Sequence, residues 1–439
     1  MSNRYLHREL RKYCESDILP MHMPGGKRRV GLLPGNDITE ITGFDNLHAP
    51  SGIIKELESG LASLWHAQEA FLSVNGATAM IGAAICAAMR YYPGGKVLAA
   101  SNCHLSVWHA IEMTGCMHAV VDPVTEPGIP FALEISPESI ETALASDPSI
   151  KTVVITSPTY EGVISDTKTI CSIARKYGCT LITDSAHGAH LGLDEYWGED
   201  AEGDLVIKST HKTLSSPTQT AVMLKYSERV RTEDIRHYVD IFESSSPSYV
   251  LMSGVSEMVE FLHSPDALKD WKDGVVFAGQ ELSKLQNIRV FSCDRKDPSK
   301  FVFICNGTAL ADILRTDYRI EAESSNSASM IAMTGIGDNR ETLGRFASAM
   351  LAIDRDHPGL ALSSPVSCRL PEHDIVMSLQ KASRCVPERI DISEAEGRTA
   401  AEYIYSYPPG IPVILPGDRI SRAQMMMTDG SVSVHAEKE

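Results

Sequence analysis

Residues 180–190 read Thr-Leu-Ile-Thr-Asp-Ser-Ala-His-Gly-Ala-His, and this stretch decides which fold the chain can adopt. Thr180–Thr183 is one of several short, largely apolar runs, as expected for strands buried in a sheet that helices cover on both sides. Asp184 follows directly, with small residues after it. In such sheets ligands bind at the edge where the strands end, so we predict that Asp184 points into a binding site.

Similar runs recur on both sides of this stretch and alternate with helical patterns. We predict strands at Glu69–Val74, Lys96–Ala100, Ala119–Val121, Thr152–Thr156, Thr180–Thr183, Leu205–Lys208 and Thr220–Leu224. Helices are predicted at Ala77–Tyr91, His104–Thr114, Pro137–Ala145 and Thr167–Tyr177. This alternation indicates an α/β fold with a mostly parallel sheet. Right-handed crossovers then gather the carboxyl ends of the strands at one edge.

The pattern changes after about residue 290, where a smaller α+β unit is expected. Its predicted strands and helix are Phe301–Cys305, Ile320–Glu323, Ser329–Met333 and Glu341–Ile353. We therefore predict an N-terminal segment at 1–50, a large domain at 51–290 and a small C-terminal domain at 291–439. The tail after Met427 is expected to be frayed.

The composition excludes several functions. Lys and Arg total 40 against 57 Asp and Glu, which gives a net charge of −17. A surface this negative repels phosphate groups, so we expect no nucleic-acid or membrane partner. The ten cysteines form no Cys-x-x-Cys pair, which is typical of reduced thiols in a cytoplasmic protein. The N-terminus is charged and the longest apolar run, Ala79–Met89, is short, so no signal sequence or membrane span is expected.

Two polar clusters follow predicted strands. One could bind a phosphate group, and the other could form a covalent bond to a ligand. Asn75-Gly76-Ala77-Thr78 precedes a helix of small residues, whose free N–H groups can bind phosphate. An ordinary N-cap turn is the alternative. Ser209-Thr210-His211-Lys212 offers a lysine that could form a Schiff base, and a solvated surface lysine is the alternative.

The other two clusters are Asp184–His190 and Ser101–His104. We predict no metal, because the spacing of His187 and His190 fits neither a helical His-Glu-x-x-His motif nor a Cys/His site. A lone histidine such as His104 is more often structural than catalytic. Together, however, a phosphate cradle, an acid, a lysine and an imidazole at successive strand ends are the parts of a pyridoxal phosphate site.

A longer series of motifs extends this pattern over nearly the whole chain. In order they are Met21–Gly25, Asp37–Glu40, Asp45–Gly52, Asn75–Thr78, Ser157–Gly162, Asp184–His190, Ser209–Lys212, Ser246–Tyr249 and Tyr407–Asp418. The series resembles the ornithine/lysine/arginine decarboxylase family, the bacterial fold-type I pyridoxal phosphate enzymes. Motifs that share an order from about residue 20 to 418 are more specific than any one of them.

The resemblance implies a PLP-dependent fold-type I (aspartate aminotransferase-like) large domain with a mostly parallel seven-stranded sheet, and a small C-terminal α+β domain. It also implies a homodimer with shared active sites, and the short family form without an N-terminal receiver-like domain. Lys212 is then the Schiff-base lysine, Asp184 pairs with the pyridinium nitrogen and His104 stacks on the ring. The other implied cofactor-binding residues are Gly76, Ala77, Thr78, Ser209 and His211 at the phosphate, Ala186 on the opposite ring face, and His187.

The implied reaction is α-decarboxylation of a basic amino acid to its amine and CO2, with arginine favoured over lysine and ornithine. Candidates to bind the cationic end of the substrate are Asp37, Glu40 and Asp45. Substrate and reaction type stay open because the chain departs from the family pattern at Gly26, Ser101, Leu105 and Ser256. One alternative is another pyridoxal phosphate enzyme, an aminotransferase or a catalyst of elimination or cyclisation. A non-catalytic regulator is the other, although a mere binder needs neither Lys212 nor Asp184.

Overall fold

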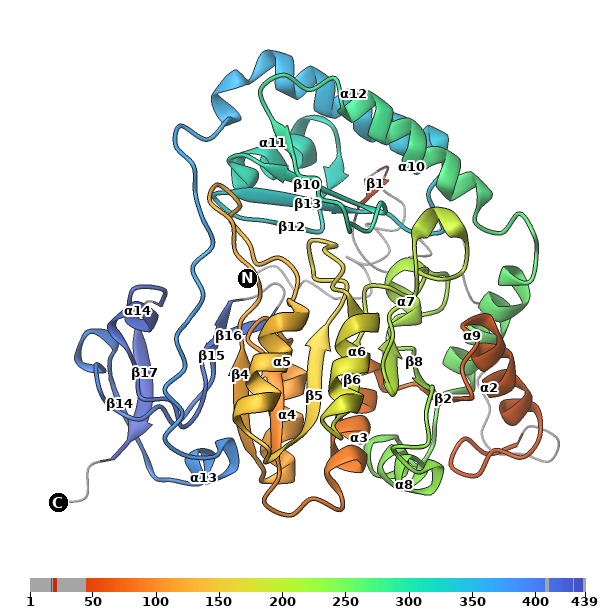
Figure 1. The fold of residues 1–439 in the computed structure, drawn as a ribbon. Coiled ribbons are helices and arrows are strands. Elements are labelled where there is room, and N and C mark those ends of the chain that lie inside the picture. The colour runs from red at the N-terminus through yellow and green to blue at the C-terminus, as the bar shows by residue number, and fades with distance from the viewer. Residues whose placement is uncertain (1–16, 18, 22–44, 407–409, 429, 437–439) are drawn as a thin grey trace, which may run out of the picture.

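A computed structural model describes residues 17, 19–21, 45–406, 410–428 and 430–436. Its centre is a seven-stranded sheet in the order β2-β8-β7-β6-β5-β3-β4 (Figure 1). The strands are β2 (Glu69–Ser73), β3 (Lys96–Ala100), β4 (Met117–Val121), β5 (Ile150–Thr156), β6 (Thr180–Asp184), β7 (Leu205–Lys208) and β8 (Ala221–Lys225). Only β8 runs against its neighbours, because it pairs antiparallel with both β2 and β7. The predicted α/β fold with a mostly parallel sheet is confirmed.

Helices cover this sheet in two groups (Figure 1). In one group α3 (Gly76–Met89) packs against α4 (Leu105–Thr114) and α8 (Thr232–Phe242). In the other, α5 (Pro137–Ser146) packs against α6 (Thr167–Lys176). Ala and Gly dominate α3, and ten of its fourteen residues are buried, as expected of a helix that is apolar on every face. This packing fixes the start of α3 at the end of β2.

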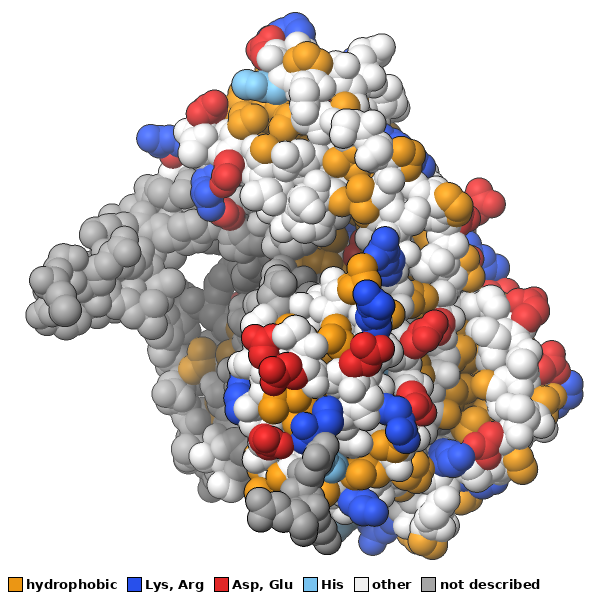
Figure 2. Space-filling view, turned by 90° about the vertical axis from the view of Figure 1, so that its left-hand side faces the viewer, with side chains coloured by type: hydrophobic (Ala, Val, Ile, Leu, Met, Phe, Trp, Pro, Cys, Tyr) orange, Lys and Arg blue, Asp and Glu red, His pale blue; other side chains and the backbone are white. Residues whose placement is uncertain are grey.

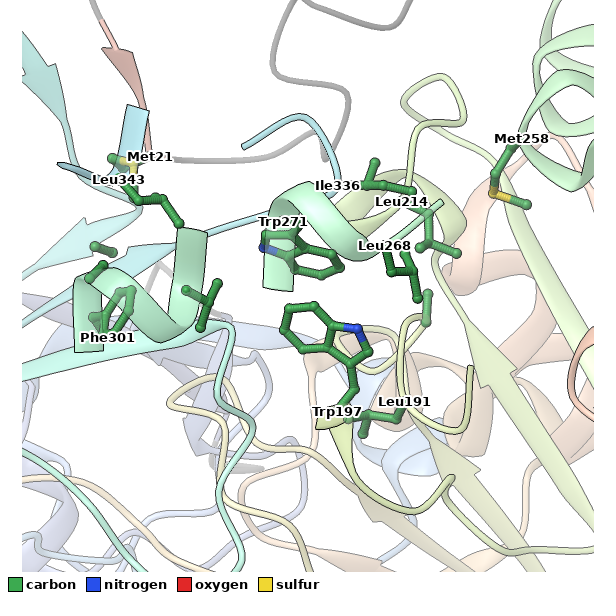
Figure 3. Close-up of a cluster of buried hydrophobic side chains, with 14 of the residues drawn as sticks. Met21, Leu191, Trp197, Leu214, Met258, Leu268, Trp271, Phe301, Ile336 and Leu343 are labelled. Carbon is green, nitrogen blue, oxygen red and sulfur yellow. The ribbon is translucent and has the colours of Figure 1, made fainter. Parts of the chain in front are cut away.

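The four-stranded antiparallel sheet β12-β13-β10-β9 forms a second layer. Its strands are β9 (Arg289–Val290), β10 (Lys300–Ile304), β12 (Ser324–Ser325) and β13 (Ser329–Met333). The helices α10 (Lys269–Leu282), α11 (Gly307–Asp317) and α12 (Arg340–Asp356) lie beside it, and β1 (Leu19–Pro20) pairs with β11 (Ile320–Glu321). Trp197, from the loop after β6, packs against Trp271 of α10 with ring centroids 4.0 Å apart, which joins the two layers (Figure 3).

The C-terminal segment forms a separate small unit beside β4 (Figure 1). Its elements are α13 (Leu379–Ser383), β14 (Pro387–Asp391), β15 (Ile404–Ser406), β16 (Ile411–Ile414), α14 (Arg422–Met425) and β17 (Ser431–His435). The expectation of a frayed tail after Met427 was wrong, because β17 pairs with β14 along its length. Val432 and Val434 alternate with polar residues and are fully buried, which supplies the free energy that holds the strand.

The predicted elements have bounds within three residues of the observed ones. Helices α2 (Ile53–Leu64), α8, α9 (Tyr249–Leu262), α10 and α11 were not predicted, and neither were the short helices α7 (Thr210–Thr213), α13 and α14. The division into domains at residues 50 and 290 stays a prediction. Within the described ranges, no helix combines the length and the apolar character needed to cross a bilayer. On the face in Figure 2, acidic and basic side chains are intermixed, with apolar side chains exposed between them.

Candidate active site

The carboxyl ends of the parallel strands bring the four predicted clusters to one edge of the sheet. Asn75 follows β2, Ser101 follows β3, Ser185 follows β6 and Ser209 follows β7. These strands all run in the same direction, β2 through its antiparallel partner β8, so the residues that follow them emerge on the same side. Prediction from the sequence therefore placed these clusters together correctly.

Lys212 lies on α7 (Thr210–Thr213), the four-residue helix that follows β7. Its Nζ lies 2.9 Å from Nε2 of His187, which follows β6. Burial lowers the pKa of Lys212 below its ordinary value, although the nearby carboxylates of Asp184 and Glu323 oppose that shift. A lysine with a lowered pKa is more often neutral, and the neutral amine is the nucleophile.

Asp184 is the last residue of β6 and is 3% exposed. Its Oδ1 accepts a hydrogen bond of 3.1 Å from the N–H of Ala186. Burial raises the pKa of Asp184, and the charges of Lys212 and His104 offset this only in part. In the chain alone, therefore, desolvation outweighs charge pairing. A cationic ring beside the carboxylate would favour its ionised form.

The start of α3 and the residues around α7 converge on the segment Gln219–Thr220. Gly76 has φ of +80°, and a Cβ built on it would lie 3.7 Å from the carbonyl oxygen of Gln219. The Nδ1 atom of His211 lies 2.9 Å from the carbonyl oxygen of Thr220. The two predicted phosphate-binding stretches, Gly76–Thr78 and Ser209–His211, thus lie against two adjacent residues of the same segment.

His104 is the N-cap of α4 and is exposed at the edge of the sheet. Its Nδ1 accepts from the N–H of Ser106 at 3.2 Å and lies 2.8 Å from the Ser106 hydroxyl. The next residue, Leu105, donates its N–H to the carbonyl of Gly410 in the C-terminal unit at 2.9 Å. The C-terminal unit therefore helps to fix the backbone that presents the imidazole.

The residues at this edge fit pyridoxal phosphate in their chemistry. They offer a lysine, a buried acid, a helix start with free N–H groups and an imidazole. Several buried polar atoms beside them have no hydrogen-bond partner among the described residues, namely Ser101 Oγ, Asn102 Oδ1, Ser185 Oγ and His187 Nδ1. Buried polar atoms without partners are rare in native proteins, and a polar ligand would supply them. In the same described part of the chain, no three His, Cys, Asp or Glu side chains are arranged to hold a metal ion.

Sequence reasoning missed a second set of polar side chains, which lies between the site and the small layer. Tyr160 packs edge-on against His187, with ring centroids 5.2 Å apart, and donates its hydroxyl to Glu323 at 2.9 Å. Nζ of the fully buried Lys300 donates to the carbonyls of Thr159 and Tyr160, each at 3.1 Å. The Ser157–Gly162 motif was the one sequence signal that could have pointed to Tyr160.

The three acids suggested for substrate binding receive no support from this geometry. Asp37 and Glu40 lie outside the described residues. Asp45 accepts hydrogen bonds from backbone N–H groups of Asn46, Ser51, Gly52, Ile54 and Lys55 at the start of α2. Despite partial burial, these bonds lower the pKa of Asp45 to about 2. Its carboxylate organises this turn, and its contact with a substrate stays a prediction.

The fold is that of the fold-type I pyridoxal phosphate enzymes. The solved Escherichia coli constitutive lysine decarboxylase superposes with a TM-score of 0.74, at 17% identity over 91% of this chain and 75% of that one. A pyridoxamine-pyruvate aminotransferase from Mesorhizobium loti gives 0.60, at 14% identity over 79% and 94%. At these identities the likeness concerns the fold.

The chain belongs to the Orn/Lys/Arg decarboxylase family. The major domain of that family matches residues 33–304 and its C-terminal domain matches residues 370–429. An arginine decarboxylase of Halalkalibacterium halodurans is 27% identical over 94% of this chain and 90% of its own length. The uncharacterised protein YaaO of Bacillus subtilis is 30% identical over 98% and 95%. The predicted class, a decarboxylase of a basic amino acid, is confirmed.

Proposed function

We propose that the chain is an arginine decarboxylase that binds pyridoxal phosphate at the carboxyl edge of its large sheet. The observation that carries the site is the pairing of Lys212 Nζ with His187, beside the buried Asp184. Arginine is favoured because relatives that cover nearly the whole chain carry that name. The match to the lysine decarboxylase LdcA of Pseudomonas aeruginosa covers 38% of this chain.

In this proposal each cluster has one task toward the cofactor. Lys212 binds it covalently, and Asp184 stabilises positive charge on its ring nitrogen. His104 covers one ring face and Ala186 the other, while His187 fixes the Lys212 amine. The phosphate group of the cofactor is held by N–H groups and hydroxyls of the stretches Gly76–Thr78 and Ser209–His211. When bound, pyridoxal phosphate accepts the electrons that remain as CO2 departs.

The chain must also supply a proton to the substrate carbon that loses its carboxylate. We assign this step to the amine of Lys212, the imidazole of His104 or another nearby donor. Because burial lowers the pKa of Lys212, its ammonium form gives up a proton more readily than a lysine in water does.

The test is product analysis by mass spectrometry, with arginine, lysine and ornithine each incubated with the cofactor-loaded protein. We expect CO2 and the amine of arginine, and loss of turnover by orders of magnitude in Lys212→Ala. The matched control is Lys176→Ala, because the side chain of Lys176 is 63% exposed and interacts with the surface residues Glu141, at 2.6 Å, and Tyr177. A keto acid in place of the amine would indicate an aminotransferase, and no turnover with any amino acid would contradict catalysis.

We also propose that the working unit is a homodimer. Two-fold dimers are the commonest soluble assembly, and the described surface exposes large apolar side chains such as Tyr91, Ile241 and Val386. We expect sedimentation velocity to give twice the chain mass of 47.9 kDa at concentrations where the enzyme is active. A fully active monomer would contradict this.

The proposal also includes a cytoplasmic location, which the free cysteines support. All cysteines in the described ranges are free thiols, as is typical of a reducing compartment. Alkylation of intact cells before lysis should therefore find these thiols reduced.

A further inference from the structure

The helix that carries Lys212 is too short to hold its own shape. α7 has four residues, whereas isolated helices need roughly 12–15 residues to be even marginally stable in water. The direction of Lys212 must therefore be set by contacts of its neighbours in α7 with the rest of the molecule. Two such neighbours, Thr210 and Thr213, are fully buried.

Thr210 anchors the first end of α7 within the large domain. Its hydroxyl lies 3.0 Å from that of Thr220 and 2.8 Å from that of Ser216. Both partners belong to the loop between α7 and β8, so this anchor is local in the sequence.

Thr213 anchors the other end through residues distant in the sequence. Its hydroxyl lies 3.2 Å from Nδ1 of His190, and its carbonyl accepts the N–H of Ile336 at 2.9 Å. Nε2 of His190 lies 2.9 Å from Oδ1 of Asp297, which also accepts the N–H of Ser299 at 2.8 Å. A continuous chain of hydrogen bonds therefore leads from α7 to the segment just before β10.

The surroundings of His190 hold its ring in one orientation. The ring packs edge-on against Trp197 at 5.2 Å and at a tilt against Trp271 at 5.1 Å, the two tryptophans that Figure 3 shows at the junction of the layers. His190 and Asp297 are both 0% exposed. An ionised carboxylate only accepts, so Nε2 carries the hydrogen toward Asp297, and in neutral His190 the Nδ1 atom accepts the hydroxyl hydrogen of Thr213.

This order of hydroxyl, imidazole and carboxylate matches that of a nucleophile activated by a His–Asp pair. Thr213 cannot attack a substrate, however, because its side chain is fully buried. The same chain of hydrogen bonds can still hold Thr213 in place, and with it the adjacent Lys212. It fixes the hydroxyl one residue after Lys212, and small displacements of a reacting group are costly in rate.

We infer that Thr213, His190 and Asp297 are positioning residues that orient Lys212 and connect it to the small layer. This inference rests on the proposed function of Lys212. The small layer thereby contributes to the direction of the lysine without touching substrate or cofactor.

The test measures how fast Lys212 bonds to added pyridoxal phosphate, by borohydride quenching and mass spectrometry of the Lys212 peptide, with kcat and KM measured in parallel. Thr213→Val keeps the shape and removes the hydroxyl. We expect a fall in the bonding rate and in kcat of between about ten- and a hundredfold, with little change in KM. Thr213→Ser restores the hydroxyl and should restore both rates.

The control is Thr152→Val, the same change at an equally buried threonine near the start of β5, at the opposite edge of the sheet. It should leave both rates unchanged. Asp297→Asn gives a second route, because it removes the charge that orients His190, and we expect a smaller fall in the same direction. Wild-type rates in Thr213→Val and Asp297→Asn, equal losses in Thr152→Val, or no recovery in Thr213→Ser would each overturn the inference. Absence of the bond at Lys212 in the wild type would instead contradict the proposed function.

Discussion

Burial acts on the two charged side chains of the site so that each favours its neutral form. It raises the pKa of Asp184 and lowers that of Lys212, and their mutual attraction offsets this only in part. In the chain alone, burial thus makes the charged form of each group unfavourable. A cationic ring nitrogen would stabilise the carboxylate, and a covalent bond to a ligand would use the neutral amine.

At this scale, Asp184→Asn should change stability and activity in opposite directions. The amide avoids the desolvation cost of the carboxylate, so the cofactor-free protein should unfold at the same or a higher temperature. Catalysis should fall by roughly 10²–10³-fold, because the positive charge on the ring nitrogen loses its partner.

Differential scanning calorimetry without cofactor and kcat with it provide the measurements. Asp354→Asn is the contrasting control, since Asp354 accepts backbone N–H groups of Gln286, Asn287 and Ile288 far from the site. That variant should lose stability and keep its kcat. A near-wild-type rate in Asp184→Asn would show that another acid serves the ring.

Two helices of very different kinds begin at the active edge. The fourteen residues of α3 are mostly small and buried, so the helix is held firmly by packing along its length. The four residues of α7 are held by hydroxyl groups at each end. The proposed phosphate site thus rests on a rigid element, whereas the lysine rests on one that depends on particular hydrogen bonds.

At the element scale, Gly76→Ala should weaken cofactor binding. A left-handed backbone costs an alanine about 1 kcal/mol, and the added Cβ has room, so the strain acts through the first peptide of α3. If that peptide turns to relieve the strain, its N–H leaves the phosphate, and affinity should fall about five- to tenfold.

Titration with pyridoxal phosphate measures the effect. Gly94 is the matched control, because it has the same φ of +80° and nothing within 4 Å of its Cβ position, in the loop at the other end of α3. Gly94→Ala should lose similar stability and keep its affinity. Equal affinities in the two variants would show that α3 does not bind the phosphate.

The C-terminal unit and the large sheet meet at a buried group of histidines. His118 of β4 is 3% exposed, and neither ring nitrogen has a partner within the described ranges. It packs edge-on against Trp108 at 5.8 Å, and His373 lies on the same indole while its Nδ1 pairs with Asp418 at 2.7 Å. The junction of the two parts is therefore sensitive to protonation.

At the scale of the molecule, His118 should make the protein less stable in acid. Burial lowers its pKa to about 4, against 6.5 when unfolded, so the unfolded chain binds more protons as the pH falls through this range. The free energy of unfolding should drop by about 2 kcal/mol between pH 7 and pH 5 from this side chain alone.

Urea unfolding of wild type and His118→Phe at both pH values measures that drop, and the variant should have a flatter pH dependence. The exposed His237 provides the control, since His237→Gln should keep the wild-type slope. Equal slopes in wild type and His118→Phe would contradict the assignment.

The sequence alone determined the large sheet and the position of Lys212, Asp184, His104 and the Gly76 turn at one edge. It could do so because strand and helix periodicity is local, and parallel strands bring their carboxyl ends together whatever the details of packing. Recognition of the family depended on the same local motifs, which keep their order along the chain. The tail after Met427 was misjudged, because burial of Val432 and Val434 in β17 outweighs the tendency of a chain end to fray.

The tertiary structure decided what the motifs touch. His190 and Asp297 are 107 residues apart, and no periodicity relates them, so their bond and its link to Thr213 emerge only when the two layers pack. Asp45 shows the same principle, because an acid in a family motif can bind a ligand or cap a helix, and only the folded backbone places N–H groups around it. Hydrogen-bond partners depend on distances of a few ångströms between remote segments, which local sequence patterns do not encode.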